Sequence, residues 1–208
     1  GCNCQAEQGE ACAILAGPYT VTHHKSTLLI GGMFSFMNAG SGTNQSNHAY
    51  KLGPRHHGVL ERGCKTASGS HISWPAHIGA FSLVMGHCAP GTDSSEWPFS
   101  YLVEQGSSHY VIPGITLRGV GTLRDIGKWP ARDGRLPQVP QTDRVSFEAF
   151  SPYTMGRVFR ARITLEELSG RFDADTQEIT WNGLRLKEKS VKQGIEWYRL
   201  ALDRYLGE

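Results

Sequence analysis

Apolar residues recur at every sixth position between residues 60 and 89. Five consecutive hexads begin with an apolar or β-branched residue (Leu60, Thr66, Ile72, Ile78 and Val84) and carry a small residue at the fifth position (Cys64, Ser70, Ala76, Ser82 and Cys88). A six-residue period indicates a hexapeptide β-helix. In such a coil the first residue of each hexad fills the interior, and each turn buries its apolar residues only against neighbouring turns. The pattern therefore predicts a left-handed parallel β-helix.

The same phase extends upstream, although a break interrupts it. Hexads that begin at Ile30 and Phe36 are in phase with Leu60, whereas residues 42–59 do not follow the pattern. Short apolar runs separated by Gly, Asn and Ser continue to about residue 127, which is typical of strands and turns. The hexads fail again at residues 89–98, and we expect a loop that projects from the coil, where binding groups usually lie. The coil is predicted to occupy residues 1–127.

Residues 128–208 follow a different pattern. Residues 128–141 contain three prolines, which indicates a linker on the surface. Helical spacing around residues 158–168, with Thr164 and Glu167 as a capping box, predicts a helix. Residues 178–186 surround an Asn182-Gly183 pair, which predicts a hairpin with a two-residue turn. Apolar residues between Val191 and Tyr205, at intervals of four and three, form one face of a last helix. The predicted fold is all-β: the β-helix, then a Pro-rich linker, a hairpin and a helical tail.

Composition and charge exclude several classes of protein. The 208 residues are 39% hydrophobic, enough for one substantial domain with an appendage. The net charge of +2 comes from dispersed residues, so we expect no nucleic-acid or membrane partner. No apolar run reaches the ~18 residues of a membrane span. Five cysteines, an odd number, argue against a disulfide framework and favour structural thiols in a reducing cytoplasm. Phosphate-binding loops, dinucleotide fingerprints and nucleophile elbows are absent from the sequence.

Long motifs mark residues 16–29, 33–42, 44–48, 50–54, 61–63, 74–76, 78–86 and 98–102, and shorter ones mark 181–187 and 194–196. Together these motifs resemble a bacterial domain-of-unknown-function family whose members resemble trimeric LpxA-like hexapeptide proteins. The resemblance covers most of residues 5–130. It implies a trimeric left-handed β-helix and carries no activity of its own. Typical members are longer, which implies that this chain is a C-terminal portion that begins inside the coil.

The densest polar stretch, between His23 and His57, holds the candidate chemistry. This stretch resembles left-handed hexapeptide acyltransferases in one respect: those enzymes use a histidine as general base in a groove between subunits. Histidine suits this role because its ordinary pKa of about 6.5 lets it accept a proton near neutrality. The candidates are His24 or His48 as the base, Asn44, Gln45 and Asn47 as hydrogen-bonding groups, and Lys25, Lys51 and Arg55 as phosphate ligands. We therefore expect transfer of an acyl group from a coenzyme A-type donor to a sugar or sugar nucleotide, in a homotrimer without a bound cofactor.

Other interpretations fit the same residues. Asn and Ser side chains that line turn corners would explain the polar stretch without any chemistry. His71, His77 and His87 suggest a zinc enzyme of the β-helical carbonic anhydrase type. Residues six apart lie on neighbouring faces of the coil, however, so a subunit interface would have to complete that site, and we assign no metal ligand. The chain could also be a non-catalytic trimerisation or glycan-binding module of a larger sugar-active protein, with residues 96–101 against the glycan. A cleft that collects His and Asn side chains would favour an enzyme.

Overall fold

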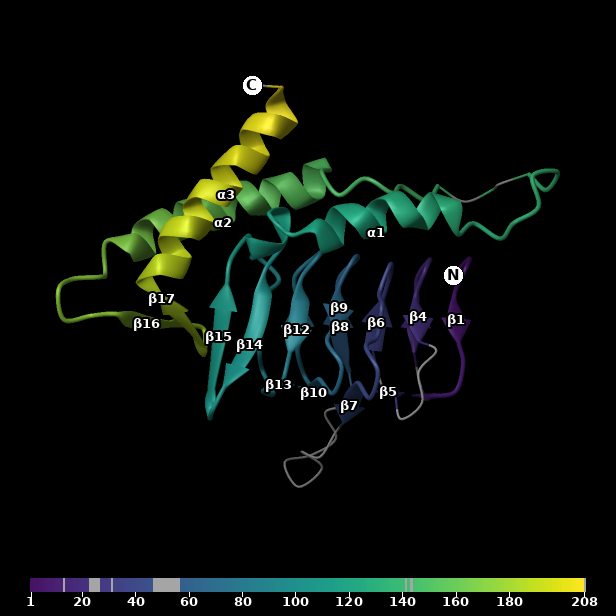
Figure 1. Ribbon diagram of the computed structural model, residues 1–208, viewed down its shortest axis with the longest axis horizontal. Coiled ribbons are helices and arrows are strands. Elements are labelled where there is room, and N and C mark those ends of the chain that lie inside the picture. The colour runs from purple at the N-terminus through teal and green to yellow at the C-terminus, as the bar shows by residue number, and fades with distance from the viewer. Residues whose placement is uncertain are drawn as a thin grey trace.

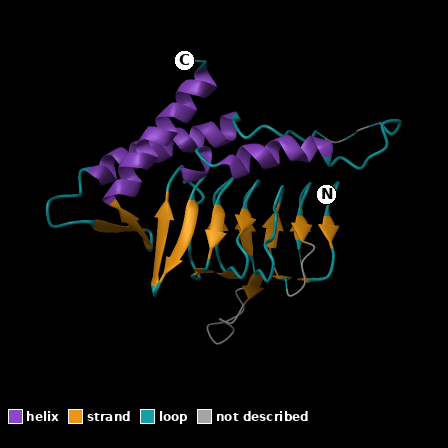
Figure 2. Cartoon of the chain, viewed as in Figure 1, coloured by secondary structure: helices purple, strands orange, loops and turns teal. Residues whose placement is uncertain are grey.

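In the computed structural model the chain forms a parallel β-solenoid with helices along one side (Figures 1 and 2). The structure describes residues 1–12, 14–22, 27–30, 32–46, 57–140, 142 and 144–207. The strands of the coil are β1 (Gln5–Ala6), β2 (Glu10–Cys12), β3 (Leu15–Ala16), β4 (Val21–Thr22), β5 (Leu28–Ile30), β6 (Gly32–Phe34), β7 (Asn44–Ser46), β8 (Gly58–Leu60), β9 (Lys65–Thr66), β10 (His71–Ser73), β11 (His77–Ile78), β12 (Leu83–Met85), β13 (His87–Cys88) and β14 (Tyr101–Gln105).

These strands form the three faces of the coil. We name them sheet A, which contains β1, β4, β9, β12 and β14, sheet B, with the order β13-β10-β7-β5-β2, and sheet C, with the order β11-β8-β6-β3. A bridge through Asn38 connects β4 to β9 within sheet A. Strand partners lie one turn apart in the sequence. Val59 pairs with His77 in sheet C, and Leu83 pairs with both Lys65 and Tyr101 in sheet A. Each of these turns has the length of three hexads, one for each face.

The first and fifth positions of the five hexads lie inside the coil. Leu60, Ile72, Ile78 and Val84 are buried, and each contributes about 1.5–3 kcal/mol of hydrophobic stabilisation. Burial extends to Thr66 and to the five small residues at the fifth positions, in agreement with their predicted place in the interior. The prediction of a coil in which each turn packs on the next is therefore confirmed for this part of the chain.

The predicted phase is wrong upstream of Leu60. Among the described residues there, the buried apolar residues of the interior are Leu29, Phe34, Met37 and Ala39, at intervals of five, three and two, and Phe36 lies outside the interior core. The reason is that the turns differ in length. The interval from Leu28 to its partner Asn44 is shorter than three hexads, and the interval from Asn44 to its partner His71 is longer. Neither interval is a whole number of hexads, so the six-residue phase is not continuous across the break.

One corner of the coil carries a column of aromatic residues. Tyr19, Phe36, Phe81 and Phe99 have positive φ angles between 49° and 60°. Ring centroids are 5.2 Å apart for Tyr19 and Phe36 and 5.0 Å apart for Phe81 and Phe99. Gly63, with φ of 76°, occupies the same corner of the turn that lies between the two pairs. Its N–H donates to the Ser35 carbonyl of the preceding turn, and the Phe81 N–H donates in the same way to the Arg62 carbonyl. We call these five residues the corner column.

Arg62 fills the gap that Gly63 leaves in the corner column. Its guanidinium carbon lies 5.0 Å from the centroid of the Phe36 ring and 5.7 Å from that of Phe81. A Cβ atom at residue 63 would come within 2.2 Å of the Phe81 ring, so glycine is required for both its conformation and its size. The cation thus continues the stack between two aromatic pairs.

Helices cover the corner column. Helix α1 (Val120–Ala131) follows a short 3-10 helix, η2 (Ile115–Leu117), and runs along one edge of the coil (Figure 1). Trp129 of α1 contacts Phe36, with 4.6 Å between ring centroids. Helices α2 (Pro152–Ser169) and α3 (Glu188–Leu206) pack against each other. Their buried residues Val158, Leu165 and Tyr198 belong to the same hydrophobic cluster as the aromatic rings of the corner column.

A second set of strands closes the end of the coil next to α3. Strand β14 pairs antiparallel with β15 (Ser108–Ile112), and β15 pairs with β17 (Leu184–Lys187), which forms a hairpin with β16 (Glu178–Trp181). Asn182 and Gly183 both have positive φ, as the predicted two-residue turn requires. The Trp181 ring stacks on that of Trp97, with 4.2 Å between centroids. The predicted hairpin is confirmed, and it covers an otherwise open sheet edge.

Three other predictions need correction. Residues 128–131 form the last turn of α1 rather than a linker, so this helix crosses the predicted boundary at residue 127. Helix α2 begins at Pro152 with a capping box of Ser151 and Thr154, so Thr164 and Glu167 lie within the helix. Residues 89–98 do not project from the coil: the His77 N–H donates to the Thr92 carbonyl, and the Ser94 N–H donates to the His77 carbonyl. That segment continues sheet C and buries Trp97.

Candidate functional site

Most of the site residues predicted from the sequence, His24, His48, Lys25, Asn47, Lys51 and Arg55, lie outside the residues that the structure describes. The other two, Asn44 and Gln45, lie on β7. Gln45 pairs with Ile72, and its side chain points into the coil with 0% exposure. Neither amide atom of Gln45 has a hydrogen-bond partner among the described residues. The structure therefore places Gln45 in the interior and away from any surface groove.

A surface groove lies over the outer face of sheet C. Strand pairing aligns Leu15 with Met33, Met33 with Val59, and Val59 with His77, so these four residues form one row across β3, β6, β8 and β11. Their exposure follows from strand alternation, since the next residues, such as Phe34, Leu60 and Ile78, fill the interior. The hollow has a volume of about 540 Å³, and its wall includes Tyr153 and Arg157 from α2. An apolar floor thus meets a polar wall.

Glu61 is the centre of the polar wall. Its Oε1 atom lies 2.7 Å from His77 Nε2 and accepts a hydrogen bond from Arg157 Nη1 at 2.7 Å. Its Oε2 atom accepts a 3.1 Å hydrogen bond from the Tyr153 hydroxyl. Arg157 also donates to the Ser95 carbonyl, and its guanidinium lies 4.6 Å from the centroid of the Tyr153 ring. The same contacts fasten α2 to the coil.

Burial strengthens the electrostatic interactions of this cluster. The side chain of Glu61 is 8% exposed and that of His77 is 37% exposed, so the carboxylate is enclosed while the imidazole reaches solvent. Burial and the charge of Glu61 raise the pKa of the Tyr153 hydroxyl, which keeps that group a hydrogen-bond donor. A carboxylate on Nε2 favours the tautomer with the proton on that nitrogen, which leaves the lone pair on Nδ1. His77 can therefore accept a proton at Nδ1 while Glu61 stabilises the imidazolium.

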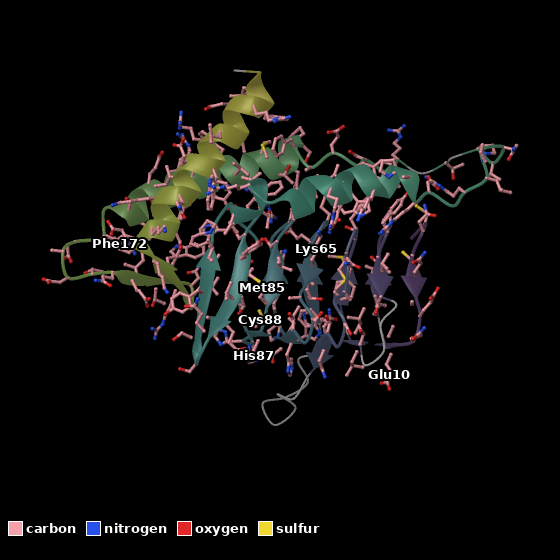
Figure 3. The ribbon with its side chains drawn as sticks, in the orientation of Figure 1. Glu10, Lys65, Met85, His87, Cys88 and Phe172 are labelled. Atoms are coloured by element: carbon pink, nitrogen blue, oxygen red, sulfur yellow. The ribbon has the colours of Figure 1, made fainter. Side chains whose placement is uncertain are left out.

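Two histidines of sheet B, His71 and His87, form a row of rings with His109 of β15. His71 and His87 have ring centroids 5.2 Å apart, and those of His87 and His109 are 5.5 Å apart. Figure 3 places His87 on the side of the coil away from the helices. His77 belongs to sheet C, so His71 and His77 lie on different faces, as the sequence predicts. Within the described ranges, no group of three or more His, Cys, Asp or Glu side chains could hold a metal ion.

The sequence interpretation missed the residues that surround His77. Glu61 appeared only as part of a family motif, and Tyr153 and Arg157 appeared in no motif. Arg157 lies 96 residues from Glu61 in the chain, and the packing of α2 on the coil brings them together. Only the proximity of Val59 and Glu61 to His77 could have been predicted from the sequence, because a turn of three hexads puts positions 59–61 beside positions 77–79 of the adjacent turn.

The fold and the groove define this chain as a parallel β-solenoid protein with a charged surface hollow. Residues 1–169 match the family described as "Domain of unknown function (DUF4954)", and the chain belongs to this family. A search of curated proteins found no match, and a search of solved structures found none either. Among the helices of the described residues, none is both long and apolar enough to cross a membrane.

Proposed function

We propose that this protein transfers an acyl group from a coenzyme A thioester to a hydroxyl or amine of a sugar or sugar nucleotide, and that the reaction takes place in the groove on sheet C. The observation that carries the proposal is the 2.7 Å contact between His77 Nε2 and Glu61 Oε1 beside an open apolar floor. A histidine oriented by a carboxylate in a surface hollow is a suitable general base. His77 thus becomes the first candidate, with His24 and His48 as further ones.

The proposal includes a finer description of the fold. We propose a left-handed coil of the hexapeptide, LpxA-like type, assembled as a cytoplasmic homotrimer with the groove between subunits. The regular turns of sheets A and C, each as long as three hexads, support a six-residue unit for each face. The buried thiols Cys64 and Cys88 agree with a reducing compartment.

The chemistry follows from the geometry of His77. Its Nδ1 atom takes the proton of the acceptor hydroxyl as that oxygen attacks the thioester carbonyl carbon. The carbon–sulfur bond then breaks, and the proton passes from the imidazolium to the leaving thiolate, so that no net proton is gained or lost. Glu61 stabilises the imidazolium between these steps. Lys25, Lys51 and Arg55 remain proposed ligands for the phosphates of the donor or acceptor, and Asn47 remains a proposed hydrogen-bonding group. Asn44 does not belong to this site, because it lies on β7 of sheet B and does not line the groove on sheet C.

A second candidate function rests on the apolar part of the same face. Leu15 is 67% exposed and Met33 is 45% exposed, and both lie in the row that floors the groove. An exposed apolar row of this kind is typical of an interface. It favours a non-catalytic module whose sheet C packs against another copy of the chain.

Product analysis of purified protein distinguishes these functions. Acetyl-, longer-chain acyl- and succinyl-coenzyme A would be incubated with a panel of sugars and nucleotide sugars, and acylated products would be detected by mass spectrometry. General-base catalysis contributes about 10²–10⁴ in rate, so His77→Ala should lose at least about 100-fold in turnover. His71→Ala, on the outer face of sheet B, is the matched control and should keep wild-type activity.

The mass of each variant in solution completes the test. A His77→Ala protein with wild-type mass and wild-type turnover would remove His77 as the base, and His24→Ala and His48→Ala would then be measured in the same way. A trimeric wild-type protein that forms no product with any pair of substrates would overturn acyl transfer with these substrates and favour the module.

A further inference from the structure

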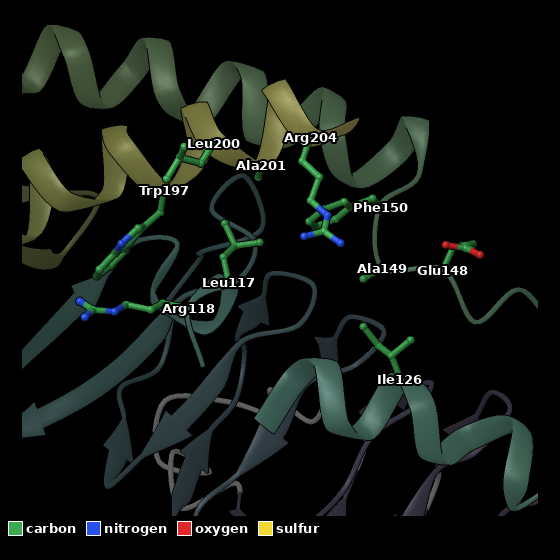
Figure 4. A pocket seen from close by; sticks show the side chains of 10 residues that line it. All are labelled: Leu117, Arg118, Ile126, Glu148, Ala149, Phe150, Trp197, Leu200, Ala201 and Arg204. Atoms are coloured by element: carbon green, nitrogen blue, oxygen red, sulfur yellow. The ribbon is translucent and has the colours of Figure 1, made fainter. Parts of the chain in front are cut away.

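A second hollow lies between α3, the end of η2, α1 and the segment that leads into α2 (Figure 4). Its volume is about 630 Å³, within the range of small-molecule sites. Apolar side chains from all of these elements line it, among them Leu117, Ile126, Phe150 and Trp197. The hollow does not share any lining residue with the groove on sheet C.

One face of α3 forms the upper wall of this hollow. This face is a single stripe of four residues at helical spacings of three, one and three: Trp197, Leu200, Ala201 and Arg204. Ala201 is buried, whereas Leu200 is 50% exposed. The stripe therefore begins with an aromatic ring, continues through aliphatic groups and ends in a cation.

The two arginines of the hollow lack counter-charges in the part of the chain that the structure describes. Arg118 and Arg204 form no ion pair among the described residues, whereas Arg157, Arg160 and Arg199 each pair with a glutamate. The acidic residue of the lining is Glu148, and in Figure 4 it lies at the far end of the hollow from Arg118. The same view shows Arg204 extending from α3 into the middle of the hollow. The lining thus carries a net charge of +1 beside an apolar surface.

We propose that this hollow binds a single-chain anionic amphiphile. Its carboxylate or phosphate head would pair with the Arg204 guanidinium, whose planar fork matches either group, and its apolar chain would lie against Trp197, Leu200 and Leu117. Arg118 adds positive potential near the Trp197 ring. The complementarity of charge selects the ligand, because a neutral or cationic amphiphile would leave both guanidinium groups unpaired. This site is independent of the proposed acyl transfer.

Calorimetric titration with ten-carbon amphiphiles tests the proposal. Decanoate, decyl phosphate, decanol and decyltrimethylammonium would each be titrated into the protein below the concentrations at which they form micelles. We expect decanoate or decyl phosphate to bind at least tenfold more tightly than the neutral and cationic compounds, and the tighter of the two identifies the head group. Arg204→Ala should weaken this binding at least tenfold, and Leu200→Glu should abolish it.

Arg199→Ala is the matched control, since Arg199 lies on the same helix, is exposed and pairs with Glu196 outside the hollow. It should bind like wild type. Circular dichroism and thermal melting would establish that each variant is folded. Equal binding of anionic and cationic amphiphiles would overturn the proposal. So would equal affinities of the Arg204→Ala and Arg199→Ala proteins, or no binding of either anion.

Discussion

Replacing Arg62 with methionine tests how the corner column joins the coil to its helices. Methionine keeps an unbranched side chain of similar reach and removes the charge and every donor. The guanidinium lies between the Phe36 and Phe81 rings, and its Nη2 atom donates to the Ser146 carbonyl at 2.6 Å. The substitution therefore removes two cation–π contacts and one charged hydrogen bond.

The expected loss of stability is a balance of opposing effects. Each cation–π contact contributes about 0.5–1 kcal/mol, or more when desolvated, and a hydrogen bond to a charged group contributes about 1.5–3 kcal/mol. Burial of the guanidinium works in the other direction. It lowers the pKa of Arg62 and leaves Nε without a partner among the described residues. We expect a net loss of about 2 kcal/mol, which lowers the melting temperature by about 4–8 °C for a chain of this size.

Thermal melting and urea denaturation followed by circular dichroism measure this loss. Arg62→Lys should lie between wild type and Arg62→Met, because it keeps the charge but loses the planar group that stacks on the rings. Arg160→Met is the control, since Arg160 is exposed and its ion pair with Glu96 should contribute less than about 1 kcal/mol. If Arg62→Met and Arg160→Met shift the midpoints equally, the guanidinium does not stabilise the corner column and our reasoning is wrong.

Two further predictions concern buried polar groups. Tyr198→Phe removes the hydroxyl that donates to the Pro98 carbonyl at 2.7 Å, so the free energy of unfolding should fall by about 1–3 kcal/mol in urea, and an unchanged midpoint would contradict this. Burial raises the pKa of the Cys88 thiol to about 11. The folded thiol keeps a proton that the unfolded thiol loses near pH 9, so stability should fall as the pH rises from about 9 to about 11. Denaturation midpoints at pH 8 and pH 10.5 should differ less in Cys88→Ala than in wild type, and an equal difference in both proteins would argue against the buried thiol.

Local sequence patterns predicted the elements whose causes are local. The burial of the first and fifth hexad positions between residues 60 and 89, the Asn182-Gly183 turn and the last helix each depend on the spacing or type of residues close together in the chain. The interior upstream of Leu60 could not be predicted in this way, because the long interval between Asn44 and His71 breaks the phase. Gln45 shows the consequence: its polarity suggested a surface site, yet the pairing of β7 with β10 places it inside the coil.

The candidate site depended more strongly on tertiary structure than the strands, turns and helices of the fold did. His77 and Glu61 lie 16 residues apart, and the length of one turn brings them together. Tyr153 and Arg157 reach Glu61 from a helix that follows the coil, and no spacing in the sequence predicts this contact. The hollow beside α3 likewise needs four separate segments.

The sequence by itself determined that a coil forms between residues 60 and 89, since a periodic interior requires only that each turn resemble the next. It also determined the hairpin turn, because Asn and Gly adopt positive φ at little cost. Tertiary structure alone decided which polar residues of the helices meet the coil. Helix α2 packs on one face of the coil and brings Arg157 to Glu61, while α3 leaves Arg204 beside a hollow. Helix packing depends on the shape and burial of whole surfaces, which no short stretch of sequence specifies.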